Sequence, residues 1–121
     1  MTTKGLIQTY YARLNQKDDT WQELWAKDAV FQDSSKTLNA SGKEAVIASF
    51  TQFLKGVTSV ELKQLIAEDN VACAIAGYIY QNQNGEELAQ DVAEVWEVSE
   101  DKLKKLIIYF DLTAYRTFMK P

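Results

Sequence analysis

The sequence predicts an α+β fold in which three N-terminal helices pack against a curled antiparallel sheet to form a cone. Two patterns support this prediction. Apolar residues in the first half recur at three- and four-residue spacing, as in amphipathic helices, whereas those in the second half alternate, as in half-buried strands. Short polar turns join the segments of the second half, so we expect an antiparallel meander. The hollow end of such a cone would form a pocket.

The first half contains three expected helices and one short strand. A polar break at 15–19 ends the first helix, a second short helix begins near Thr20, and a third covers about 42–55. A short strand at 29–31 lies between the second and third helices and runs into Asp33. The apolar stripe of the first helix consists of Leu6, Ile7, Tyr10, Tyr11 and Leu14.

The second half contains four expected strands, at 58–68, 71–82, 87–99 and 103–115. Alternation in the third strand places Val92, Glu94, Trp96 and Val98 on one face. In the last two strands both faces carry apolar residues, so the sheet needs a cover on each side. The helices supply one cover, and a second copy of the chain would supply the other, which predicts a homodimer through the sheet.

Composition restricts the function. A chain of 121 residues with 46% hydrophobic residues fits one domain, 1–121. The net charge of −4 and the lack of a basic cluster argue against a nucleic-acid partner. No apolar run approaches the roughly 20 residues that a membrane span requires. The single cysteine, Cys73, cannot form an internal disulfide, and we expect a cytoplasmic protein with this residue in the core.

The chain has no histidine. A Ser-His-Asp triad, a Cys-His pair and a histidine-based metal site are therefore excluded. Acid–base chemistry near neutral pH would depend on Asp, Glu, Tyr or Lys side chains with shifted pKa values. We expect no metal, because carboxylates do not cluster at ligand spacing, and no cofactor.

The order of elements and several motifs resemble the nuclear transport factor 2-like superfamily, which includes ketosteroid isomerase and the SnoaL-like polyketide cyclases. The resemblance covers the whole chain. The motifs that carry it are a tyrosine-bearing helix, a strand that ends in Asp, a Gly-led helix and two late strands. In the sequence they read "YYARLNQKDD", "LWAKDAVFQDSS", "ASGKEAVIASF", "DVAEVWEV" and "KLIIYFD".

The resemblance to ketosteroid isomerase implies a catalytic set. Asp33 falls at the position of the general base, and Glu94 falls near the second acid, which donates a hydrogen bond to the developing oxyanion. Tyr11, or Tyr10 in a shifted register, falls near the oxyanion tyrosine. The histidine of the SnoaL-like cyclases has no counterpart here, so their mechanism does not carry over intact.

Each of these residues also has a structural interpretation. Asp33 before two serines is typical of a turn. Glu94 would be paired or neutralised if its face is interior, or solvated if that face is wet. Tyr10 and Tyr11 are also typical core aromatic residues whose hydroxyls find a partner.

The combined prediction is a small-molecule-binding SnoaL-like protein, and its more specific form is a cofactor-free isomerase with a carboxylate base and an apolar carbonyl substrate. The alternative is a non-catalytic ligand-binding or protein-interaction module of the same fold. Residues expected to bind the ligand line the pocket or its mouth, and they are Tyr10, Phe31, Phe53, Trp96, Phe110 and Asp111.

Overall fold

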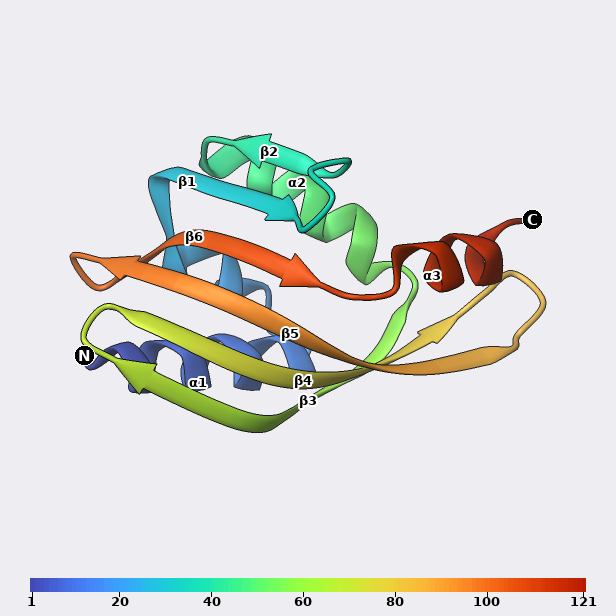
Figure 1. The fold of residues 1–121 in the computed structure, drawn as a ribbon, viewed down its shortest axis with the longest axis horizontal. Helices are drawn as coiled ribbons and strands as arrows, with labels where there is room; N and C mark the ends of the chain where they lie inside the picture. Colours follow the sequence, from blue (N-terminus) through green and yellow to red (C-terminus); the bar gives the residue numbers. More distant parts are fainter.

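The computed structural model describes residues 1–121 and consists of helices packed on a six-stranded sheet (Figure 1). Three α-helices and one 3-10 helix, η1, accompany the strands. The elements in chain order are α1 (Thr3–Asn15), η1 (Asp19–Leu24), β1 (Trp25–Asp33), β2 (Asn39–Ser41), α2 (Lys43–Leu54), β3 (Val57–Glu68), β4 (Val71–Gln81), β5 (Glu87–Ser99), β6 (Lys102–Tyr109) and α3 (Leu112–Met119).

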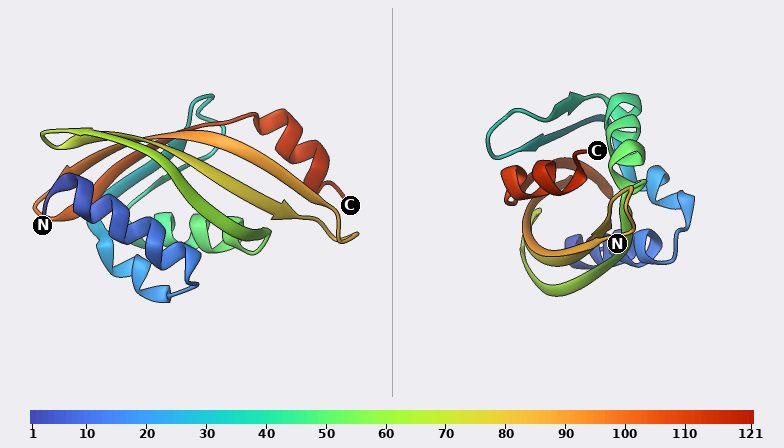
Figure 2. Two further views of the ribbon diagram at one scale, coloured as in Figure 1. Left: turned by 90° about the horizontal axis from the view of Figure 1, so that it is seen from below. Right: turned by 90° about the vertical axis from the view of Figure 1, so that its right-hand side faces the viewer.

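The strands follow the order β2-β1-β6-β5-β4-β3 across one mixed sheet. The long strands β3 to β6 form an antiparallel meander, while β1 pairs with β6 in parallel and with β2 in antiparallel orientation. The sheet curls strongly, and the end-on view in Figure 2 shows the strands of the meander bent into an incomplete ring. This arrangement confirms the predicted α+β cone.

Alternation along the strands separates an inner face from an outer face. In β5, Val92, Glu94, Trp96 and Val98 are all buried, as the sequence predicted. Their paired neighbours are also buried, for example Leu106 opposite Trp96. Because paired residues of adjacent strands point to the same side, these rows form the inner face on which α1 and α2 pack.

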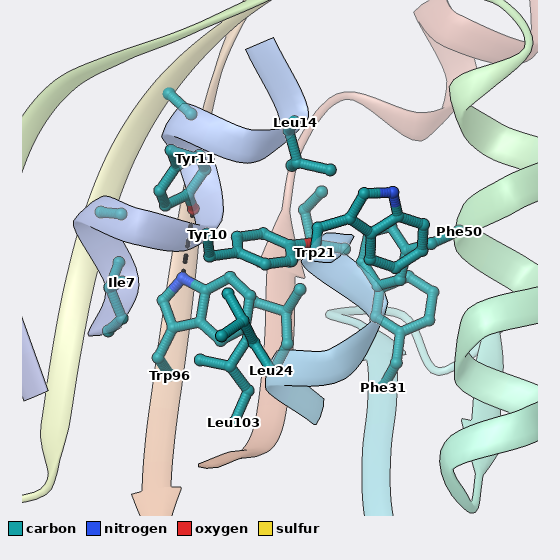
Figure 3. Packing of buried hydrophobic residues seen from close by; sticks show 14 of the residues in the cluster. Ile7, Tyr10, Tyr11, Leu14, Trp21, Leu24, Phe31, Phe50, Trp96 and Leu103 are labelled. Atoms are coloured by element: carbon teal, nitrogen blue, oxygen red, sulfur yellow. Dashed lines mark hydrogen bonds between the residues drawn. The ribbon is translucent and has the colours of Figure 1, made fainter. Parts of the chain in front are cut away.

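Aromatic rings dominate the core at the narrow end of the cone. Tyr10 of α1 lies at its centre, with ring centroids 5.0 Å from Trp96 and 5.9 Å from Trp25. It also makes edge-on contacts with Tyr11 and Trp21. Figure 3 shows Tyr10, Tyr11, Trp21 and Trp96 gathered between α1, η1 and the sheet. The core therefore fills the narrow end.

The last predicted strand, 103–115, is wrong beyond residue 109. Strand β6 ends at Tyr109, and α3 begins after Asp111, whose Oδ1 accepts a hydrogen bond from the Ala114 amide at 2.9 Å. This side chain caps the helix and so ends the extended segment. None of the helices is both long and apolar enough to cross a membrane.

Candidate functional site

A cavity of about 750 Å³ lies at the wide end of the cone. Its walls come from the end of β1, the β1–β2 loop, α2, the β4–β5 hairpin and α3. The lining residues are Phe31, Thr37, Leu38, Asn39, Ser49, Phe50, Gln52, Phe53, Lys55, Gly56, Thr58, Gln81, Asn82, Gln83, Ile108, Phe110, Tyr115 and Met119.

Aromatic rings form much of the cavity wall. Phe31 and Phe50 lie 4.7 Å apart between centroids, and Tyr115 lies 5.7 Å from Phe53 and 5.8 Å from Phe110. The polar side chains of the lining are hydroxyls and amides, and Lys55 is its one charged residue. A wall of this kind can enclose a flat apolar molecule and orient it with a few hydrogen bonds.

Helix α3 forms a wall that the sequence analysis missed. Tyr115 packs on Tyr80 at 4.9 Å between ring centroids, and Asn82 Nδ2 donates to the Phe118 carbonyl at 3.2 Å. The helix lies so close to Gly56 that a Cβ atom there would be 2.6 Å from Cε of Met119. Two signals in the sequence could have revealed this helix. They are the capping residue Asp111 and the helical spacing of Tyr115, Phe118 and Met119.

The predicted binding residues divide into two groups. Phe31, Phe53 and Phe110 line the cavity. Tyr10 and Trp96 are instead closed in the core, and Asp111 caps α3, so these three do not line it.

Asp33 ends β1 on the inner face and is 2% exposed. Its Oδ1 accepts a hydrogen bond from the Leu38 amide at 2.8 Å, and its Oδ2 accepts from both the hydroxyl and the amide of Ser35. Burial raises the pKa of the Asp33 carboxyl, but these hydrogen bonds outweigh burial and lower the pKa below its usual value. Asp33 is thus an ionised carboxylate that holds the β1–β2 loop.

Asp33 and Glu94 lie in one row of the sheet, with Ile108 between them. Asp33 of β1 pairs with Ile108 of β6, which pairs with Glu94 of β5. All three side chains are buried on the inner face, and the two carboxyl-bearing strand positions are about 10 Å apart. Ile108 lines the cavity, but neither Asp33 nor Glu94 does. The two carboxyls therefore flank the cavity floor without opening into it.

Glu94 is completely buried and tied to two tyrosines. Its Oε1 accepts hydrogen bonds from the hydroxyls of Tyr11, at 2.5 Å, and Tyr78, at 2.9 Å. The Tyr11 hydroxyl in turn accepts a hydrogen bond from Trp96 Nε1 at 3.1 Å, drawn as a dashed line in Figure 3. This network joins α1, β4 and β5. The predicted pair of Tyr11 and Glu94 is thus in direct contact.

Burial raises the pKa of Glu94 to about 7, although the hydrogen bonds from Tyr11 and Tyr78 oppose the shift. Its second oxygen, Oε2, has no hydrogen-bond partner, and the buried hydroxyls of Tyr10 and Tyr80 have none either. Phe53 separates this network from the cavity, since its ring contacts Tyr78 and Tyr80 and also lines the cavity. The network therefore lies directly behind the cavity wall.

These features can be compared with known proteins. The profile of the SnoaL-like domain family matches residues 7–106, and the chain belongs to this family. No curated protein matches the sequence.

Solved structures show the same fold at low sequence identity. An NTF2-like protein of unknown function from Burkholderia pseudomallei superposes with a TM-score of 0.84 at 12% identity, with 98% of each chain covered. TerC, co-crystallised with polyporic acid, superposes with a TM-score of 0.81 at 12% identity, with 98% of each chain covered. A protein with the ketosteroid isomerase-like fold from Catenulispora acidiphila, in complex with trimethylamine, superposes with a TM-score of 0.79 at 12% identity. The match covers 94% of this chain and 91% of that chain.

The shifted pKa of Glu94 predicts how stability depends on pH. Unfolding returns the pKa from about 7 to 4.5, so between these pH values the folded chain holds a proton that the unfolded chain has lost. The retained proton stabilises the folded chain. Its contribution to the free energy of unfolding is about 3 kcal/mol, is fully present below pH 4.5 and is lost as the pH rises to 7. A neutral Glu94→Gln side chain removes the titration.

Urea denaturation of both proteins between pH 4.5 and pH 8 measures the effect. As the pH rises from 4.5 to 8, the free energy of unfolding of Glu94→Gln should increase relative to that of the original protein. The control is Glu97→Gln, at an outward and exposed position of the same strand, whose difference from the original protein should vary little with pH. If the free energy of unfolding depends on pH in the same way for Glu94→Gln and the original protein, the raised pKa of Glu94 is contradicted.

Proposed function

We propose that this protein binds a small, largely apolar molecule in the cavity at the wide end of the cone. The observation that carries the proposal is the cavity itself, because about 750 Å³ lies within the range of small-molecule sites. Its aromatic wall offers apolar contact area, and its amide and hydroxyl groups offer a few hydrogen bonds. The narrow end, by contrast, is filled by the aromatic core.

Two structural neighbours support this assignment. TerC was crystallised with polyporic acid, and the protein from Catenulispora acidiphila with trimethylamine. Both share the fold of this chain, and in both cases the structure contains a small organic molecule. These ligands differ in charge and size, so the fold does not itself select one ligand.

A variant that fills the cavity tests the proposal. Ser49 lies on α2 and lines the cavity, whereas its neighbour Ala48 is exposed on the same helix. A phenyl ring at position 49 would occupy ligand space, so Ser49→Phe should weaken binding of the fluorescent neutral probe N-phenyl-1-naphthylamine about tenfold or more. Ala48→Phe, the matched control, should change the dissociation constant less than about twofold.

Thermal melts of both variants confirm that they are folded at the temperature of the titration. If folded Ser49→Phe binds the probe as tightly as Ala48→Phe does, the cavity is not the binding site.

A second candidate function is a cofactor-free isomerase that acts on an apolar carbonyl substrate. The row of Asp33, Ile108 and Glu94 favours it, because a substrate that rests on Ile108 would have one carboxyl on each side. Asp33 would act as the base that removes a carbon-bound proton. Glu94, neutral below its pKa of about 7, and Tyr11 would stabilise the enolate oxygen. Phe53 would have to turn aside to expose Glu94, and the β1–β2 loop would have to release the Asp33 carboxylate.

This candidate predicts a specific pattern of rates. With a β,γ-unsaturated ketone as substrate, the conjugated product is followed by its ultraviolet absorbance. Asp33→Asn and Glu94→Gln should each lower the rate on the order of 100-fold or more. The control variant Glu97→Gln should retain the original rate. If the original protein is no faster than buffer, or if both variants retain its rate, this chain does not use these carboxyls for isomerisation.

We also propose that two copies of the chain associate through the outer face of the sheet. Ile66, Val71 and Tyr109 are exposed there, at 64%, 43% and 47%. The paired row Ile66, Cys73, Val95 and Ile107 extends the apolar surface across four strands. Cys73 is therefore half-buried on this outer face, and the expectation that it lies in the core is wrong. Two ion pairs, Lys63–Asp91 and Lys105–Glu97, bound this surface and are each neutral overall. A second copy would therefore cover apolar area that is otherwise exposed to solvent.

A lysine in the centre of this face should disrupt the dimer. Light scattering after size-exclusion chromatography should give about twice the mass of 13.8 kDa for the original protein and a single-chain mass for Val95→Lys. Gln16→Lys, at the exposed end of α1, adds the same charge away from the sheet and should leave the dimer intact. A monomeric original protein would exclude this interface.

A further inference from the structure

The charges around the cavity are distributed unlike those of the whole chain. The protein has 17 acidic and 13 basic residues, yet none of the acidic residues lines the cavity. The one charged lining residue is Lys55. A ligand in the cavity therefore meets one positive charge and no negative charge in the wall.

Lys55 stands at the C-terminal cap of α2 with its ammonium group largely free. Its Nζ donates one hydrogen bond, to Gln52 Oε1 at 3.2 Å, and Gln52 also lines the cavity. It forms none of the four ion pairs of the structure. A lysine at a helix C-terminus is favourable by itself, but an ammonium group has three protons to donate, and two of them remain available here.

Further positive charges lie next to the lining in the amino-acid sequence. Three basic residues are next in the chain to lining residues, and none of them is in an ion pair. Asp111 is the only acidic residue in such a position, and one of its carboxylate oxygens already caps α3. Glu86 also lies near the lining, but its Oε1 already accepts a hydrogen bond from Asn82 Nδ2 at 3.0 Å. The basic residues and their lining neighbours are Lys36 beside Thr37, Arg116 beside Tyr115, and Lys120 beside Met119.

We infer that the ligand of this cavity is an aromatic anion, whose rings contact the phenylalanine wall and whose acidic group pairs with Lys55. The inference rests on the proposed binding function and specifies its ligand class. A carboxylate, sulfonate or phenolate oxygen would accept a charge-assisted hydrogen bond from Nζ. The amide group of Gln52, whose oxygen already holds Nζ, can donate a second hydrogen bond from its nitrogen.

A cationic ligand fits the same cavity less well. Aromatic rings such as Phe50 and Phe110 attract cations through their faces. A cation would nevertheless have no carboxylate to pair with in the wall, and Lys55 would repel it. The buried Asp33 carboxylate is already held by the β1–β2 loop and does not line the cavity. The charge pattern thus favours an anion.

Two probes with one aromatic skeleton test this inference. 8-Anilinonaphthalene-1-sulfonate carries a sulfonate, and N-phenyl-1-naphthylamine lacks it. Lys55→Met keeps the aliphatic stem and removes the charge, so it should weaken binding of the sulfonate probe about three- to tenfold. Binding of the neutral probe should change less than about twofold. Lys43→Met, at the opposite end of the same helix and outside the lining, should affect neither probe.

The Ser49→Phe variant separates the two proposals. If it blocks both probes but Lys55→Met binds the sulfonate probe as tightly as the original protein does, cavity binding stands and the anion inference is overturned. The inference is also overturned if Lys55→Met weakens both probes equally, or if Lys43→Met has the same effect as Lys55→Met. If Ser49→Phe leaves both probes bound, or if the original protein binds neither, the proposed binding function fails and the inference fails with it.

Discussion

The structure depends on how one buried carboxyl group, that of Glu94, is accommodated in an aromatic core. Two tyrosine hydroxyls, from Tyr11 and Tyr78, donate to the same oxygen of this group. An isolated ionised carboxylate would be very unfavourable at such a site, so the group favours its protonated form, and its pKa rises to about 7. The hydrogen bonds also fix α1 over the sheet, because Tyr11 belongs to the helix and the other two residues to β4 and β5.

This core determines where a ligand can lie. The rings around Tyr10 fill the narrow end of the cone. Phe50 separates them from the remaining space, because its ring contacts Trp21 and Trp25 and also lines the cavity. The cavity is therefore confined to the wide end, where α2, α3 and the two loops meet. Ile108 forms part of its floor between the two inward carboxyls. Ligand binding at the wide end and proton chemistry at the carboxyls are thus adjacent but distinct properties of the same inner face.

Sequence patterns predicted the fold and part of this site. Alternation in β5 placed Glu94 inside, and the resemblance brought it together with Tyr11. Alternation could not show that Ile108 separates Glu94 from Asp33, because that depends on the parallel pairing of distant strands. The alternation pattern also could not reveal α3, because the apolar alternation of β6 continues in the sequence past Tyr109. In the structure the side chain of Asp111 caps the helix at this point. The cavity wall contributed by α3 was missed for the same reason.

A titration of the Glu94 carboxyl carbon by nuclear magnetic resonance tests the central claim, which is that this group is buried and largely neutral below pH 7. Isotope labelling of glutamate and comparison with Glu94→Gln identify its signal. The structure predicts a midpoint near pH 7, against 4.5 for an unperturbed glutamate. The midpoint should remain well above 4.5 when N-phenyl-1-naphthylamine is bound. A midpoint at or below 4.5 would contradict the claim, because it would mean that water or a cation reaches the carboxylate.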